Sequence, residues 1–380
     1  MRNRIYLDHA ATTGLSPEAL REMMPFLTEC MGNPSSIHGT GREAAMALMK
    51  ARKRIAEALG AEPSEIYFTS GGSESDNWAL KGAAFANRAR GRHIITTQIE
   101  HHAVLHTCQW LERQGFEVTY LPVDGRGRTD PEAAERAIRP DTVLISVMTA
   151  NNEIGTIQPV AEIAGIARER GILFHTDAVQ AAGALPLHPA EMQADLMSLS
   201  AHKFHGPRGI GLLWVRRGVR IDPLIHGGAQ ERGLRAGTEN LAGAVGMAAA
   251  LEQAVRDLPE RTRNIAGLRD LLIRGIQEAV PEAKLNGDPV RRLPGNAHFT
   301  FPGVDGEALL LRLDLAGIAC SGGSACTAGA TEPSHVLTAL GQTPEESRGG
   351  LRMTLGEENT EEEIREVLRV LPPIVKELRR

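Results

Sequence analysis

Short apolar runs recur along the chain between about residues 45 and 215, and segments with helical spacing of apolar residues separate them. The runs are EIYFTS, HIITTQ, EVTYLP, TVLISVMT, ILFHTDA, DLMSLS and GIGLLWV. Strands that alternate with helices in this way predict a mostly parallel sheet with helices on both faces. A run such as TVLISVM is apolar throughout, which is typical of a strand covered on both faces. The pattern therefore predicts an α/β fold.

The pattern changes after about residue 240. A long helical segment, NLAGAVGMAAALEQAVRDL, leads into a smaller α+β part with strands near AHFTF and LRMTL and a final charged helix, TEEEIREVLRVLPPIVKELRR. A chain of 380 residues also exceeds the ~250–300 residues at which a single core stops growing. We therefore predict a large domain over 15–244 and a small domain formed by 1–14 and 245–380.

Composition narrows the class of protein. Hydrophobic residues make up 42% and charged residues 23%, as in ordinary globular proteins. The net charge of −5 provides no basic field for nucleic acid, so no direct nucleic-acid ligand is expected. The first residues lack the apolar stretch of a signal peptide, and no run reaches the ~18 apolar residues of a membrane span. With only four cysteines, a disulfide scaffold is not expected, and we predict a cytoplasmic protein.

Polar residues follow several of the predicted strands at their carboxyl ends, which is where open α/β sheets bind ligands. An isolated group of this kind is commonly a helix cap, and Ser73 with Asp76 alone would be read as a capping box. Several such endings on one sheet instead predict a shared site. The groups are Gly71 to Asp76, Glu100-His101-His102, Asn151-Asn152-Glu153, Asp177 with Gln180, and Ser200-Ala201-His202-Lys203.

A single ligand explains this set of side chains. Pyridoxal 5'-phosphate requires a lysine for a Schiff base and a carboxylate on its pyridinium nitrogen. It also requires a ring that stacks on its face and a helix N-terminus for its phosphate. Lys203, Asp177, His101 and the turn at Gly72 and Ser73 supply these groups in that order, so we expect a pyridoxal-phosphate enzyme.

The order of motifs supports a narrower interpretation. The motifs are LDHAATT, GNPSSIHG, TSGGSESDN, EHHAV, NNEIG, HTDAVQ, SAHKFHGPRGIG, ERGLRAGTEN and SGGSACTAGATEPSHVL. Together they resemble the cysteine desulfurases, members of the class V aminotransferase-like superfamily of fold-type I pyridoxal-phosphate enzymes, over residues 5 to 356. The resemblance implies removal of sulfur from L-cysteine to give L-alanine.

The resemblance implies a role for each group around the cofactor ring. Lys203 would be the Schiff-base lysine and the base for the reaction, and Asp177 the partner of the pyridinium nitrogen. His101 would stack on the ring as an acid/base, and Gln180 would donate a hydrogen bond to the ring hydroxyl.

The resemblance also implies which residues bind the cofactor phosphate and the substrate. Asn152 and Arg352 would orient the substrate carboxylate. Thr238 would reach the phosphate from a second subunit, which implies a homodimer. The other expected phosphate contacts are Gly72, Ser73, Ser200 and His202.

Cys326 differs from Cys30, Cys108 and Cys320, which need only a packing role. It lies among small residues in CSGGSACTAGA, a composition that predicts a mobile surface loop over about 320–334. A thiolate on such a loop can attack a substrate sulfur and carry it away as a persulfide. The run Ser321 to Ala325 is similar to that before the active cysteine of the longer-loop desulfurases, so Cys326 is the expected sulfur carrier.

Several alternatives stay open at this point. A selenocysteine lyase or another class V enzyme would share the lysine and the aspartate, and a plain aminotransferase would not need Cys326. His102 and His106 have the spacing of metal ligands on a helix, which would suit a metal hydrolase, although no resident metal is expected. The sulfur acceptor is expected to be a protein, namely an iron–sulfur scaffold, a tRNA-thiolation carrier or a DNA-modification system.

Overall fold

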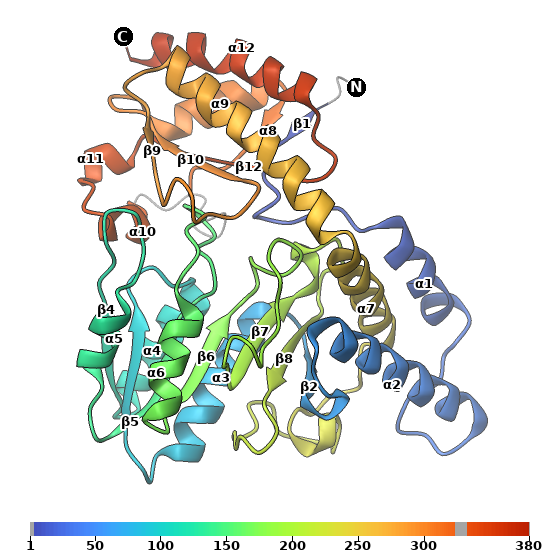
Figure 1. The fold of residues 1–380 in the computed structure, drawn as a ribbon. Coiled ribbons are helices and arrows are strands. Elements are labelled where there is room, and N and C mark those ends of the chain that lie inside the picture. The colour runs from blue at the N-terminus through green and yellow to red at the C-terminus, as the bar shows by residue number, and fades with distance from the viewer. Residues whose placement is uncertain (1–3, 324–332, 380) are drawn as a thin grey trace.

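The computed structural model describes residues 4–323 and 333–379. A seven-stranded sheet forms the centre of the larger part (Figure 1). Its strands, in spatial order, are β2 (Ile66–Thr69), β8 (Gly211–Val215), β7 (Leu196–Ser200), β6 (Leu173–Asp177), β5 (Thr142–Ser146), β3 (His93–Thr97) and β4 (Glu117–Leu121). These strands confirm the sheet that the apolar runs predict.

Only β8 runs against the others, because it pairs antiparallel with both β2 and β7. The pairs from β7 across to β4 are parallel. The strands β2, β3, β5, β6 and β7 therefore point the same way, and their carboxyl ends meet at one edge of the sheet. This arrangement brings the predicted polar groups to the same place.

Helices cover both faces of this sheet, as predicted. On one face α3 (Gly72–Asn87) and α4 (His102–Arg113) pack on buried strand residues such as Leu144, Leu196 and Leu213. The other face is covered by α1 (Pro17–Thr28), α2 (Gly39–Leu59), α6 (Val160–Glu169) and α7 (Leu241–Arg256), and α5 (Pro131–Ala137) lies against α6. The remaining short helices of this part are η1 (Pro63–Glu65), η2 (Ala201–Lys203) and η3 (Glu231–Gly233).

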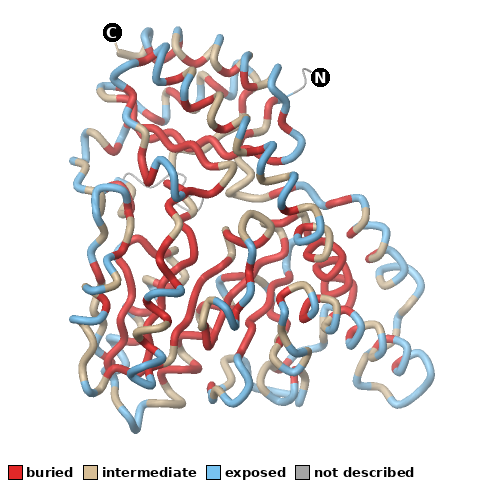
Figure 2. The backbone as a smooth tube through the Cα atoms, viewed as in Figure 1, coloured by how far each residue is buried: buried red, intermediate tan, exposed pale blue. Residues whose placement is uncertain are grey.

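A smaller α+β part has its own hydrophobic core (Figure 2). Its strands are β9 (Lys284–Leu285), β10 (Asn296–Thr300) and β12 (Gly350–Thr354), with β1 (Ile5–Tyr6) paired to β11 (Ile318–Ala319). Its helices are α8 (Leu258–Ala279), α9 (Gly306–Leu315), α10 (His335–Ala339), α11 (Pro344–Ser347) and α12 (Glu361–Leu378). The two-residue strands β1, β9 and β11 were not expected, because two residues carry no readable alternation.

The domain boundary near residue 245 stays a prediction. It falls inside α7, whose residues as far as Ala254 pack in the core of the large sheet. The core of the small part begins at Ile265 and includes Ile5 and Leu7 from the other end of the chain. Packing therefore favours a boundary after Arg256, with the first strand counted in the small part.

Candidate functional site

A cavity of about 190 Å³ lies at the carboxyl edge of the sheet, beneath the small part. It brings together all the predicted site residues except Thr238 and Cys326. Its walls are formed by Ala10, Ala11, Gly72, Ser73, Asp76, His101, Met148, Asn152, Asp177, Val179, Gln180, Ser200, His202, Lys203 and Arg352.

Lys203 ends the short helix η2, directly after β7. Its ammonium donates hydrogen bonds to the backbone carbonyls of Ala10 and Ala11, the second at 2.9 Å. The Gln180 amide also donates to the Ala10 carbonyl, at 2.9 Å. The segment between β1 and α1 therefore positions two side chains expected to contact a cofactor.

Asp177 ends β6 and is 6% exposed. One carboxylate oxygen accepts a hydrogen bond from the Val179 N–H at 2.9 Å. Burial raises the pKa of Asp177 to about 6, while the Val179 N–H and the nearby Lys203 ammonium favour its charged form. A cationic ring nitrogen at this place would favour the carboxylate further.

His101 caps α4, and its Nδ1 accepts a hydrogen bond from the Ala103 N–H at 3.1 Å. Burial, followed by repulsion from Lys203, lowers the pKa of His101 to about 4. The imidazole is therefore neutral near pH 7. A neutral planar ring that faces the cavity can stack on another ring without a charge penalty.

The first turn of α3 faces the cavity with Gly72 and Ser73. A Cβ at residue 72 would lie 2.7 Å from a methyl group of Val179, so only glycine fits here. Within residues 4–323 and 333–379, no side chain caps this helix, which leaves its N–H groups available to an anion. Ser73 and Asp76 do not form the capping box that they would suggest if taken alone, and Asp76, at 1% exposure, lines the cavity instead.

Ser200 and His202 lie on the far side of this helix start and also line a solvent-open hollow of about 360 Å³. His202 Nδ1 is 3.2 Å from the Thr12 hydroxyl. Burial, followed by Lys203, lowers the pKa of His202 to about 4. Hydroxyl, imidazole and amide groups around a helix N-terminus make a donor set that fits a phosphate.

Arg352 lies in β12 of the small part and is 1% exposed. Its guanidinium donates to the Asp8 carboxylate at 2.8 Å and to the Asn152 carbonyl at 3.1 Å. The other Asp8 oxygen accepts from the Ser321 hydroxyl at 2.9 Å. Asp8 therefore joins the predicted carboxylate-binding arginine to the start of the predicted cysteine loop.

Two predicted residues stand apart from this cavity. Thr238 is exposed, in the segment between η3 and α7. Cys326 falls in 324–332, outside the described residues, and its role stays a prediction.

Three carboxyl groups near the cavity were given no individual role from the sequence, although Asp76 and Glu100 lie in segments predicted to share the site. Asp8 was not predicted as a site residue, because its partner Arg352 lies 344 residues away in the sequence. Asp76 and Glu100 are buried, and burial raises the pKa of both, that of Glu100 to about 8. A polar residue one turn inside an apolar helix, as Asp76 is in α3, is the signal that would have pointed to it.

The geometry gives little support to the metal alternative at His102 and His106. Their ring centroids are 5.0 Å apart, yet among the described residues neither belongs to a group of three or more metal-type ligands. The groups of that kind are Asp76-His101-Asp177 in the cavity and His205-Glu357-Glu358 outside it.

Comparison with known proteins gives a consistent result. The family described as aminotransferase class-V matches residues 5–367. The chain is 56% identical over 375 residues to the cysteine desulfurase IscS of Methanosarcina thermophila, covering 99% of this chain and 93% of that protein. It is 54% identical over 381 residues to the cysteine desulfurase IscS of Clostridium botulinum, covering 100% and 96%. A solved NifS-like protein superposes with a TM-score of 0.93 at 43% identity, covering 99% of this chain and 100% of that one.

Proposed function

Because the chain belongs to the aminotransferase class-V family and is a pyridoxal-phosphate-dependent cysteine desulfurase, we propose that Lys203 holds its cofactor and that Cys326 receives the sulfur of L-cysteine. The Cys326 thiolate forms a bond to the substrate sulfur as the Cβ–S bond breaks. The electron pair of that bond stays with Cβ, which takes a proton and becomes the methyl group of L-alanine.

The observation that carries this proposal is the cavity that gathers an amine, a buried carboxylate and an open helix N-terminus. Asp177 is buried beside Lys203, and the Val179 N–H and the Lys203 ammonium both favour its charged form. The Gly72 backbone and the hydroxyl groups of Ser73 and Ser200 supply phosphate donors. These residues fit pyridoxal 5'-phosphate, which supplies an electron sink for the substrate Cα.

The protein's own groups handle the substrate. Arg352 supplies a positive charge for the carboxylate of L-cysteine, and Asn152 lines the same cavity. Lys203 would take the proton from the substrate Cα as a neutral amine, and the Ala10 and Ala11 carbonyls hold its Nζ at the cavity wall. Neutral His101 covers the face of the bound ring.

A homodimer is part of the proposal, since Thr238 is exposed and would act in a partner's site. The η3 segment before it is fixed to α2 by a bidentate ion pair between Arg52 and Glu231, at 2.6 and 2.7 Å. The neighbouring surface of α1, α2 and their connection exposes an unusual number of large apolar side chains, which a second copy would cover. They are Leu20, Met24, Leu27, Met31, Ile37, Met46 and Met49.

The sulfur acceptor is proposed to be a protein of iron–sulfur cluster assembly. The relatives named IscS support this class of acceptor. A cytoplasmic location is proposed as well, supported by Cys30, Cys108 and Cys320, which are unpaired thiols in the described part of the chain. Every helix that the structure describes is too short or too polar to cross a membrane.

The test compares four single cysteine-to-serine variants in the presence of L-cysteine. Burial raises the pKa of Cys108, and burial followed by Asp8 raises that of Cys320 to about 12, so both are poor nucleophiles. Cys326→Ser should retain the bound cofactor yet lose sulfide release by orders of magnitude. Cys30→Ser, Cys108→Ser and Cys320→Ser are the matched controls and should remain active.

Mass spectrometry of the enzyme after brief turnover locates the transferred sulfur. We expect an additional sulfur atom on Cys326 and an equal amount of alanine. Normal turnover of Cys326→Ser, or an additional sulfur on another cysteine, would overturn this assignment while leaving the cofactor site intact.

A further inference from the structure

Two histidines and two glutamates gather where the small part meets the large part. His205 follows η2, His9 precedes Ala10, and Glu357 and Glu358 follow β12. His205 Nε2 is 4.0 Å from Glu357, His205 Nδ1 is 3.7 Å from Glu358, and His9 Nδ1 is 3.9 Å from Glu358. We propose that this cluster, the seam cluster, binds a divalent transition-metal ion of the Zn²⁺ type.

The His9 side chain is the strongest evidence for a ligand. It is 10% exposed, and its Nδ1 has no hydrogen-bond partner in the part of the chain that the structure describes. A buried polar atom without a partner destabilises the folded state. A Cβ at residue 356 would lie 2.4 Å from this nitrogen, so Gly356 allows the ring to lie against the backbone that leads to Glu358. A bound cation would satisfy the nitrogen in this position.

His205 is oriented as metal-binding histidines usually are. Its Nδ1 is 3.1 Å from the Gly14 carbonyl, so the Nδ1–H donates there. This tautomer leaves the lone pair of Nε2 on the side of Glu357. A backbone carbonyl that fixes the second ring nitrogen is the common outer-shell partner of a histidine ligand.

The spacing and the charge both suit zinc. Zinc–ligand bonds of about 2.0–2.2 Å place neighbouring ligand atoms of a tetrahedral site roughly 3.3–3.5 Å apart. The His205 Nε2–Glu357 and His9 Nδ1–Glu358 distances of 4.0 and 3.9 Å are longer than this, so these side chains must move toward one another to share an ion. The possible ligand atoms of His205, Glu357 and Glu358 already lie within 4.8 Å of one another. Arg261, the nearby cation, donates instead to the carbonyls of Gly183 and Ala254.

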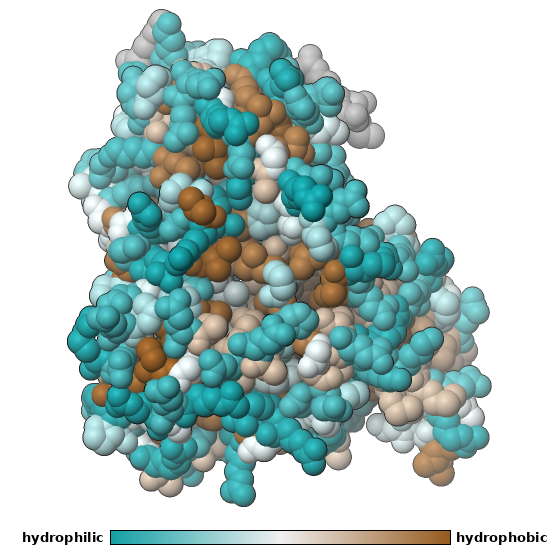
Figure 3. All heavy atoms as spheres, in the orientation of Figure 1, coloured by the Kyte–Doolittle hydropathy of each residue, from teal (hydrophilic) through white to brown (hydrophobic). Residues whose placement is uncertain are grey.

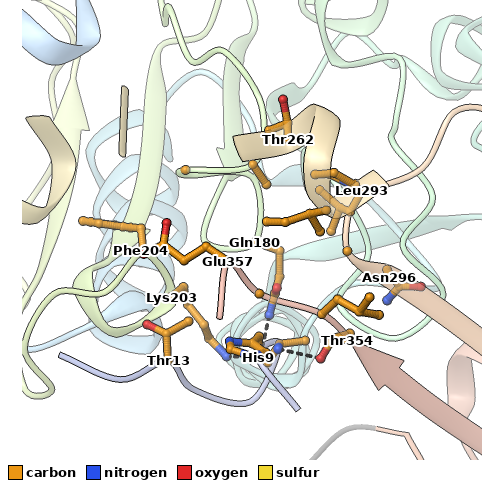
Figure 4. Close-up of a pocket in the computed structure, with 18 of the residues that line it drawn as sticks. His9, Thr13, Gln180, Lys203, Phe204, Thr262, Leu293, Asn296, Thr354 and Glu357 are labelled. Atoms are coloured by element: carbon orange, nitrogen blue, oxygen red, sulfur yellow. Dashed lines mark hydrogen bonds between the residues drawn. The ribbon is translucent and has the colours of Figure 1, made fainter. Parts of the chain in front are cut away.

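The seam cluster borders a second cavity, of about 100 Å³, and this cavity reaches Lys203 (Figure 4). In Figure 4, His9, Lys203 and Glu357 line the same space. Figure 3 shows hydrophobic side chains gathered in the hollow between the two parts. An ion held by His9, His205 and the glutamates would join both parts next to the turn that carries the lysine.

The test measures binding of Zn²⁺ to the holoenzyme by equilibrium dialysis. Cys326→Ser serves as the background, because a thiolate also binds zinc. The double variant Glu357→Gln/Glu358→Gln removes two ligands at exposed positions, where folding is unaffected. Glu260→Gln is the matched control, because this exposed glutamate lines a cavity next to Glu357 without belonging to the seam cluster.

We expect one Zn²⁺ per chain, an affinity that falls at least about tenfold in the double variant, and no change in Glu260→Gln. X-ray absorption at the zinc edge should show nitrogen and oxygen neighbours alone. The absence of saturable binding, equal affinity in the double variant, or sulfur around the zinc would each overturn the seam-cluster proposal. None of these readouts depends on desulfurase activity.

Discussion

The Arg352 guanidinium and the Asp8 carboxylate form a hydrogen-bonded ion pair at 2.8 Å beside the cavity. The pair joins β12 to the segment after β1, and the arginine is 1% exposed. A buried arginine needs such a partner, because an unpaired buried charge is costly. Asp8 and the Asn152 carbonyl therefore hold the two terminal nitrogens of the guanidinium at the cavity wall.

Replacing Asp8 with asparagine should weaken L-cysteine binding. The amide keeps the shape of the side chain but loses the charge that orients Arg352. A loss of about 1.4 kcal/mol in positioning corresponds to a roughly tenfold rise in KM. Steady-state kinetics should show KM changing more than kcat, with cofactor absorbance intact.

Arg352→Lys keeps the positive charge but loses the planar guanidinium, and it should raise KM further. A wild-type KM in that variant would remove Arg352 from the substrate site.

Lys203→Ala should abolish the visible absorbance of the bound cofactor, because the covalent link through Nζ is lost. The purified wild-type protein should be yellow. Lys81→Ala is a suitable control, since this lysine lies in α3 over the ring of Trp110, away from the cavity. A wild type that stays colourless after addition of pyridoxal phosphate would contradict the cofactor assignment.

Thr238→Ala should lower cofactor affinity about tenfold if its hydroxyl contacts a partner's phosphate. Coexpression of Thr238→Ala with Lys203→Ala tests directly whether Thr238 acts in the partner's site. A mixed dimer contains one site with an intact lysine and an intact threonine, so half of its sites should regain wild-type cofactor affinity. Sedimentation should show a dimer for every variant. A fully active monomer would refute the shared site.

Acid should destabilise the apoprotein partly through His175. This buried histidine contacts the hydroxyls of Ser146 and Ser198, and burial lowers its pKa to about 3. Below about pH 6.5, His175 is protonated in the unfolded chain but stays neutral in the folded chain. The free energy of unfolding therefore falls as the pH decreases. Between pH 6.5 and 5 this contribution is about 2 kcal/mol.

His175→Gln should reduce the decrease of the free energy of unfolding at acid pH, whatever its effect on stability at pH 7. Urea midpoints at several pH values provide the measurement. Asp177 acts in the opposite direction, because its raised pKa lets the folded state bind a proton between about pH 4 and 6. Since Asp177 is present in both proteins, only the difference between their slopes reports on His175; identical slopes would contradict the buried neutral imidazole.

Much of this molecule could be predicted from local sequence. The apolar runs around β5 and β7 identified the sheet, and the polar residues that follow them, Asn152 and Lys203, do line one cavity. The reversed direction of β8 was not predicted, because antiparallel and parallel pairing of a fully buried strand give the same apolar run. The local pattern of Ser73 and Asp76 fits both a capping box and a shared site, and the folded structure distinguishes them because no described side chain caps α3.

Contacts between residues that lie far apart in the chain could not be predicted from the sequence either. His9, His205 and Glu358 each fit an ordinary surface or capping role, and only the folded chain brings each histidine within about 4 Å of Glu358. The same holds for Thr238, whose motif indicates a phosphate contact but whose exposed position shows that its own cavity does not use it.

The long sequence separation between Asp8 and Arg352 has a consequence for biosynthesis. Chains emerge from the ribosome N-terminus first, so the cofactor groups from Gly72 to Lys203 are available well before the arginine. A chain truncated before β12 would carry the lysine and the aspartate but would lack the guanidinium that we propose to bind the carboxylate of L-cysteine. The order of synthesis thus delays recognition of L-cysteine until the polypeptide is nearly complete.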